Sequence, residues 1–135
     1  MTASRMTASR MTAHQVAQFQ AEAVGVLVPF GPTEVEPDGV TVAEADFARS
    51  VFPRVPFEAA RFTVPPGGTS SPDQHAVQEI WVVHAGSGTL EVDGERSVVG
   101  PGSLVGFASQ AVHEIFADQG EELVIYSFWW SAPDE

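Results

Sequence analysis

Glycine and proline interrupt the second half of this chain at short intervals. Turn-forming sequences stand at 65–68 (PPGG), 86–88 (GSG), 93–94 (DG), 100–102 (GPG) and 118–120 (DQG). Runs of about four to eight residues that are rich in β-branched and aromatic side chains lie between these turns, which is typical of strands. Short strands separated by turns predict a small all-β protein, either a sandwich or a barrel.

The alternation of apolar and polar residues places the expected strands. We expect a hairpin around Asp93-Gly94, because that dipeptide suits a two-residue turn. Residues 33–39 are predicted to be a loop, and residues 43–49 either one helical turn or a loop that carries Phe47 inward. The strands are predicted at 40–42, 57–64, 77–83, 89–92, 95–99, 104–107, 113–117 and 123–130.

The N-terminal part is less regular. The pentapeptide MTASR occurs twice and begins again at Met11, and we expect residues 1–13 to be flexible. Residues 14–50 are predicted to be an N-terminal helix, at 14–23, and a strap that packs on the barrel. Residues 51–131 are predicted to form the barrel itself, so the chain is interpreted as one domain.

Charge and composition exclude several classes of protein. The formal net charge is −12, with only six Lys and Arg residues, so nucleic acid and anionic membrane surfaces are not expected partners. The absence of cysteine excludes disulfides and thiolate metal sites. No apolar run approaches the roughly 18 residues of a membrane span, and no signal peptide is evident, so we expect a cytoplasmic protein.

A cluster of polar residues precedes the predicted strand 77–83. If this stretch is extended, Asp73, His75 and Glu79 share one face with Trp81. Unpaired charge on a core face is unfavourable, and a metal ion would remove that penalty. His113 begins a strand after a turn and could supply a further ligand from across the barrel.

These residues carry a resemblance to the first cupin motif, which is glycine, five residues, His-x-His, three residues, Glu, six residues, glycine. Gly67, His75, Glu79 and Gly86 stand at the family spacing. Asp73 occupies the position of the usual first histidine.

The second cupin motif is glycine, five residues, proline, one residue, glycine, two residues, histidine, three residues, asparagine. Gly102 and His113 match its ends at the right separation, whereas Ala108, Gln110 and Ala117 replace its proline, glycine and asparagine. The chain therefore resembles a small single-domain cupin over about residues 57–130.

The resemblance implies a double-stranded β-helix, the cupin jelly-roll barrel, with one divalent metal ion in its mouth. The resemblance implies three metal ligands at positions where this chain has the family's residue types, and these are His75, Glu79 and His113. For Asp73 three roles stay open: binding the metal, orienting a water, or acting as a base. Fe²⁺, Zn²⁺ and Mn²⁺ all suit two imidazoles with carboxylates.

The expected function is that of a metal-dependent enzyme acting on a small organic metabolite. The metal either activates dioxygen, as in a dioxygenase, or acts as a Lewis acid, with Asp73 or Glu79 as the catalytic group that handles protons. The alternative is a non-catalytic small-ligand-binding or structural cupin with a degenerate metal site. By analogy with other cupins we also expect a homodimer.

Three further residues are candidates for substrate binding. Trp81 and Phe107 could line a pocket beside the metal, although plain core packing is the alternative for each. Arg61 precedes the first motif and could bind an anionic group, although a surface salt bridge would also explain it.

Overall fold

The computed structural model describes residues 27–52 and 54–131. The chain divides into two compact units, residues 1–29 with 46–54, and residues 30–45 with 55–135. In the first unit the 3₁₀ helix η1 (Phe47–Arg49) begins after Asp46, whose carboxylate accepts a hydrogen bond from Arg49 Nε at 2.8 Å. Within the described ranges, no helix has the length and apolar character needed to cross a bilayer.

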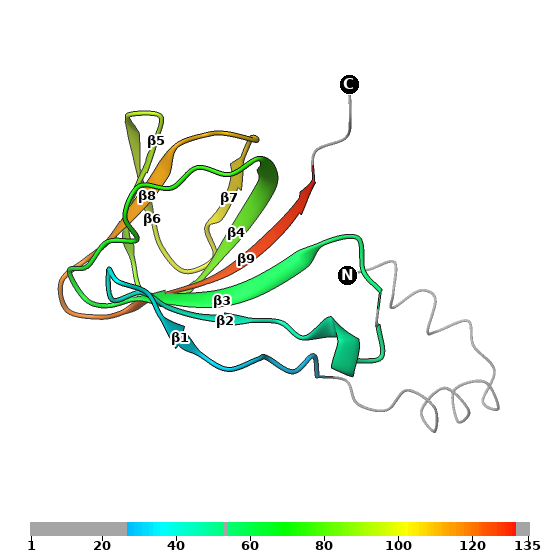
Figure 1. Cartoon of the computed structure of the whole chain (residues 1–135). Coiled ribbons are helices and arrows are strands. Elements are labelled where there is room, and N and C mark those ends of the chain that lie inside the picture. The colour runs from blue at the N-terminus through cyan, green and yellow to red at the C-terminus, as the bar shows by residue number, and fades with distance from the viewer. Residues whose placement is uncertain (1–26, 53, 132–135) are drawn as a thin grey trace, which may run out of the picture. The chain divides into compact units, whose positions relative to one another are not determined.

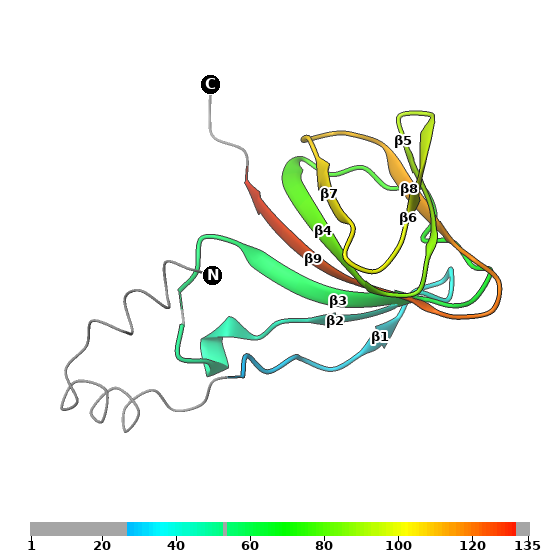
Figure 2. The ribbon, with the colours of Figure 1, turned by 180° about the vertical axis from the view of Figure 1, so that it is seen from behind.

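The second unit consists of two antiparallel sheets, which form the walls of an open barrel (Figures 1 and 2). One sheet has six strands in the order β1-β2-β3-β9-β4-β7, and the other has three in the order β6-β5-β8. The strands are β1 (Glu34–Val35), β2 (Thr41–Glu44), β3 (Glu58–Val64), β4 (Val77–Ala85), β5 (Gly88–Val92), β6 (Glu95–Val99), β7 (Leu104–Phe107), β8 (His113–Ala117) and β9 (Leu123–Ser131).

The barrel is filled by the side chains that alternate toward its interior. In β4 the residues at 79, 81 and 83 are buried, and in β9 those at 123, 125 and 127 are buried. Since side chains on a strand alternate between its faces, each of these strands presents one continuous row to the core. The buried apolar cluster contains Val40, Phe62, Val64, Trp81, Val83, Leu90, Val99, Phe107, Ile115, Ala117, Leu123 and Ile125.

Two glycine-containing turns fix how strands meet. Asp93 and Gly94 both have positive φ, +49° and +88°, as the predicted two-residue hairpin turn between β5 and β6 requires. At Gly88, an added Cβ would clash with the carbonyl oxygen of Phe116, so β5 and β8 approach each other more closely than a side chain would allow.

The all-β prediction is confirmed, and all the expected strands are present. The ranges 95–99, 104–107 and 113–117 are observed as predicted, and the others differ by one or two residues at one or both ends. The final strand, predicted at 123–130, extends by one residue to Ser131.

Three local predictions need correction or stay open. Residues 33–39 are not entirely loop, because Glu34–Val35 pairs with β2 as the short strand β1. In 43–49 the first two residues belong to β2, and only the end forms a helical turn, at η1. The predicted helix at 14–23 and the MTASR repeat lie outside the described residues.

Candidate metal centre

Glu79 is a buried acid in the middle of β4, with both of its carboxylate oxygens inside the barrel. Its Oε2 accepts hydrogen bonds from Trp81 Nε1 at 2.7 Å and from Ser127 Oγ at 2.5 Å. Its Oε1 is buried and has no hydrogen-bond partner within the described part of the chain. A buried carboxylate oxygen without a hydrogen-bond partner is unfavourable, so a bound cation or a hydrogen-bond donor on a ligand would stabilise this atom.

His113 is held so that one ring nitrogen faces Glu79. Its Nδ1 lies 3.1 Å from the carbonyl oxygen of Ala111. Since a carbonyl only accepts, Nδ1 carries a proton in this contact, and in the neutral ring Nε2 is then the nitrogen with a lone pair for a metal. The ring stacks on Phe107, with centroids 4.4 Å apart, and Trp81 meets it edge-on at 5.5 Å. These contacts leave Nε2 3.7 Å from Glu79 Oε1.

His75 comes from the loop that precedes β4, and that loop is fixed by its backbone. Asp73 and His113 exchange two backbone hydrogen bonds of 2.9 Å, which dock the loop on the start of β8. The carbonyl oxygen of His75 accepts from Gln110 N at 2.6 Å, and Ser109 Oγ donates to Ala76 O at 3.0 Å. The sequence following β7 therefore positions His75, although no strand contains it.

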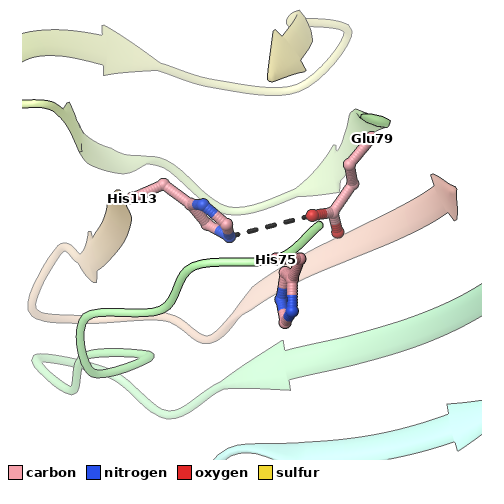
Figure 3. A group of neighbouring side chains, drawn as sticks. All are labelled: His75, Glu79 and His113. Carbon is pink, nitrogen blue, oxygen red and sulfur yellow. Dashed lines mark ion pairs between the residues drawn. The ribbon is translucent and has the colours of Figure 1, made fainter. Parts of the chain in front are cut away.

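The three side chains converge. His75, Glu79 and His113 each offer one ligand atom, and these atoms all lie within 4.8 Å of one another. Figure 3 shows the His113 ring directed at the Glu79 carboxylate, with His75 on the adjacent loop. His113 is buried, whereas the His75 side chain is 43% exposed and lies on the open side of the cluster.

A divalent metal ion fits this arrangement. Two ligand atoms bound to one ion at about 2.1 Å each can be up to about 4.2 Å apart, so the 3.7 Å between His113 and Glu79 needs no rearrangement. The ligand atom of His75 lies within 4.8 Å of the other two, and the exposure of this side chain leaves it room to move toward an ion. The Nδ1 contact of His113 and the two donors to Glu79 Oε2 are the outer contacts that commonly orient metal ligands.

The cluster lies in the wall of a large cavity. The cavity has a volume of about 750 Å³, which is in the range of small-molecule binding sites. It is lined by Glu36, Pro37, Asp38, Val40, Val42, Glu44, Ala60, Phe62, Ser70, Ser71, Pro72, Asp73, His75, Ala76, Val77, Glu79, Trp81, His113, Ser127 and Trp129.

The other predicted site residues lie in different places. Asp73 lines the cavity and its Oδ2 lies 3.1 Å from His75 Nε2, but it is not one of the three clustered ligands. Trp81 lines the cavity, whereas Phe107 is buried behind His113. Arg61 lies on the other face of β3 from the cavity-lining Phe62, with its guanidinium 4.4 Å from the ring centroid of Phe30.

Ser127 is a site residue that the sequence interpretation missed. It is 3% exposed and donates to the oxygen of Glu79 that does not face His113. A signal was present, because Ser127 shares the inward parity of Leu123 and Ile125 in an otherwise apolar strand. A hydroxyl at a core position needs a buried partner, and Glu79 on the neighbouring strand provides it.

Comparison with known proteins agrees with this geometry. The family model for the cupin domain matches residues 60–129, which is more than half of the chain. The chain belongs to the cupin domain family. Its two sheets are the double-stranded β-helix that the motif spacing implies.

Solved cupin structures share the fold over most of the chain. A cupin 2 conserved barrel domain protein from Salinispora arenicola is 24% identical, with a TM-score of 0.66 over 81% of this chain and 91% of that one. One from Rhodopseudomonas palustris is 27% identical, with a TM-score of 0.62 over 82% and 75%. A predicted oxalate decarboxylase from Thermotoga maritima is 18% identical, with a TM-score of 0.58 over 78% and 94%.

Proposed function

We propose that this cupin is a metal-dependent enzyme that acts on a small organic molecule. The observation that carries the proposal is the buried Oε1 of Glu79, which accepts no hydrogen bond from the described residues and faces Nε2 of His113 at 3.7 Å. A protein that used Glu79 only as a structural acid would be expected to satisfy both oxygens. Here the two protein donors both go to Oε2, which leaves Oε1 available as a ligand.

The surroundings of the three ligands suit catalysis at an open metal ion. His75, Glu79 and His113 would hold a divalent ion, which would supply Lewis acidity or, as Fe²⁺, dioxygen activation at the cavity that these residues line. Ser127 and Trp81 fix the Glu79 carboxylate, and the packing of Phe107 fixes the His113 ring. The chain thus supplies a ligand set whose buried members are held in place before any substrate binds.

Asp73 is the remaining acidic group beside the ligands. Its Oδ1 accepts from Gln74 N at 2.8 Å, and its Oδ2 contacts His75 Nε2. The side chain is 57% exposed, so it can exchange protons with solvent. We propose that Asp73 orients His75 and acts as the base for a substrate bound in the cavity.

Metal analysis tests the proposal directly. The purified full chain is dialysed against Fe²⁺ under anaerobic conditions, or against Zn²⁺ or Mn²⁺, and bound metal is measured by elemental analysis. We expect about one equivalent in the wild type and none in His113→Ala or His75→Ala. His84→Ala is the matched control, because His84 is exposed and contacts Tyr126 away from the cavity. Absence of bound metal in the wild type with all three ions would refute the proposal.

A second measurement separates the two reaction types. Oxygen consumption by the Fe²⁺-loaded protein, followed with a panel of small organic substrates, reports dioxygen activation. Turnover that occurs equally under nitrogen and with Zn²⁺ points instead to Lewis-acid chemistry.

A further inference from the structure

The outer face of the six-stranded sheet is apolar, although the chain as a whole is strongly acidic. In β3, β4, β7 and β9 the residues that alternate with the inward-facing ones point away from the barrel interior. At these outward positions none of the described residues is Asp or Glu, and Arg61 is the single Lys or Arg. We define the outer apolar face by the side chains of Ile80, Val82, Leu104, Tyr126, Phe128 and Trp130.

The strand register makes these residues one continuous surface. One cross-strand row runs from Leu104 through Val82 to Tyr126, over β7, β4 and β9. The adjacent row pairs Ile80 with Phe128 on β4 and β9. Residues that lie directly opposite each other in antiparallel strands have Cβ atoms about 5 Å apart, so their side chains touch. The outer apolar face is therefore a contiguous patch and not a set of scattered apolar residues.

The barrel covers part of this face with its own aromatic rings. Phe30 lies against Tyr126 with ring centroids 6.4 Å apart, and Phe57 lies against Phe128 at 6.0 Å, so both contacts are over β9. On the edge strand β7, by contrast, the Leu104 side chain is 71% exposed. A contiguous apolar patch that reaches an exposed edge is typical of a contact with another molecule.

The outer face of the three-stranded sheet has a different character. There Glu91 and Glu114 stand opposite each other on β5 and β8, and Arg96 Nε donates to Glu91 Oε1 at 2.9 Å. The lack of carboxylates on the larger sheet is therefore a property of that face and not of all outward positions. Few charges together with Tyr, Phe and Trp is the composition that distinguishes the buried centre of protein–protein interfaces.

The net charge indicates which partner fits this face. Each chain carries a formal charge of −12, so two copies repel each other, and a contact that brought their carboxylates together would add to that repulsion. A face without Asp or Glu is where two copies can meet at the lowest electrostatic cost. An acidic partner of another kind would need cations, but the single guanidinium of this face, that of Arg61, already lies over the ring of Phe30 at 4.4 Å.

We propose that two copies of this chain associate through the outer apolar face, with the two-fold axis near β4 and β7. A two-fold contact uses the same patch on both subunits, so a face that lacks acids on one copy meets a face that lacks them on the other. At about 3.3 Å per residue and about 4.8 Å between strands, β3, β4, β7 and β9 cover about 450 Å² in each copy. About 900 Å² in total is at the lower end of specific interfaces, so we expect a weak dimer with a dissociation constant of about 1 to 100 μM.

Sedimentation equilibrium of the chelator-treated full chain tests the association and its charge dependence, without reference to the proposed metal function. We expect the dissociation constant to fall about threefold to tenfold as NaCl rises from about 20 to about 300 mM, because salt screens the repulsion between two chains of charge −12. A contact held together by ion pairs would weaken as salt is added. A dimer that weakens with salt, or a protein that stays monomeric up to about 500 μM at the higher salt concentration, would overturn the proposal.

Two matched variants locate the contact. Leu104→Glu puts a carboxylate on the outer apolar face of each copy, and it should weaken the dimer at least about tenfold. Because this side chain is exposed in the single chain, the near-ultraviolet circular dichroism of the variant should match that of the wild type. Val98→Glu is the control, since Val98 is 84% exposed on β6 of the other sheet, and it should leave the dimer unchanged.

Three results would refute this assignment of the interface. A dimer that tolerates Leu104→Glu has its contact elsewhere, and so does a dimer that Val98→Glu weakens by the same factor. A monomeric wild type whose Tm falls in Leu104→Glu would mean that the chain covers this face itself.

Discussion

Replacing Glu79 by glutamine distinguishes two possible roles of this residue, a metal ligand and a buried acid that only stabilises the fold. Glutamine has nearly the same shape, and its amide oxygen can accept the bonds that Trp81 Nε1 and Ser127 Oγ now donate to Oε2. Its amide nitrogen then takes the place of Oε1 and can donate to Nε2 of a neutral His113 ring whose proton is on Nδ1. The variant therefore gives a partner to the one atom of the metal-free site that lacks one among the described residues.

The size of the effect follows from these contacts. Two charge-assisted hydrogen bonds become neutral ones, which weakens each by about 1 kcal/mol. Against this, the variant removes a carboxylate whose burial costs several kcal/mol. We expect the metal-free variant to be more stable than the metal-free wild type by about 1 to 2 kcal/mol, which raises Tm by roughly 3 to 8 °C. Its metal affinity should fall by at least about 100-fold, because a ligand is lost.

The assay compares chelator-treated proteins by urea denaturation and then repeats the measurement with added Zn²⁺. Metal should stabilise the wild type and leave Glu79→Gln unchanged. Glu114→Gln is a matched control, because Glu114 Oε2 accepts from Thr69 Oγ1 at 2.6 Å but does not line the cavity. A Glu79→Gln protein that is less stable without metal, and that still binds metal as the wild type does, would contradict the reasoning.

Four other substitutions probe the site and the packing of the barrel. His113→Ala should abolish metal binding and lower the free energy of unfolding by about 1 to 3 kcal/mol, since the ring packs against Phe107 and Trp81. His75→Ala should also abolish metal binding, but it should change the free energy of unfolding by less than about 0.5 kcal/mol because its side chain is exposed. Elemental analysis and urea denaturation check both variants, and equal stability losses would contradict the burial assigned to the two histidines. Asp73→Asn should lower metal affinity by about 10-fold to 100-fold without abolishing it, because Asp73 contacts the ligand His75. Competition with a chelator measures this affinity, and a complete loss of metal binding would indicate that Asp73 is a direct ligand. Gly88→Ala should reduce the yield of folded protein, as judged by near-ultraviolet circular dichroism, because the added Cβ would clash with the Phe116 carbonyl oxygen. Gly94→Ala is the control, since the space around that position is open, and it should lower the free energy of unfolding by only about 1 kcal/mol.

Local sequence determines most of the strands because their signals are local. Alternation marks one buried face per strand, and glycine and proline mark where the chain must turn. The Asp93-Gly94 turn is an example, since positive φ at both positions is a property of those two residues and their neighbours. The short strand β1 is not predictable in this way, because Glu34 and Val35 carry too little pattern to show a strand. Only pairing with β2 makes them one.

Parity along a strand predicts which side chains share a face. Phe62 faces the cavity, so its neighbour Arg61 faces away, and the same rule places His84 on the face opposite Glu79. A strict application of parity to β3 therefore places Arg61 on the face opposite an inward-facing Phe62.

The metal ligands and their surroundings depend on different kinds of information. Strand parity pointed to His75 and Glu79, and motif spacing joined His113 to them, because a family resemblance records which distant residues meet. The arrangement around them was decided only by the tertiary structure. The bonds that direct both protein donors to Oε2 of Glu79 come from β4 and β9, and Ser127 is 48 positions from Glu79 in sequence. Glu36 and Glu44 line the same cavity as the three ligands only because β2 pairs with β3 in the six-stranded sheet. Contacts between strands so distant in the chain leave no local pattern, and it is these contacts that determine which oxygen of Glu79 accepts the two hydrogen bonds.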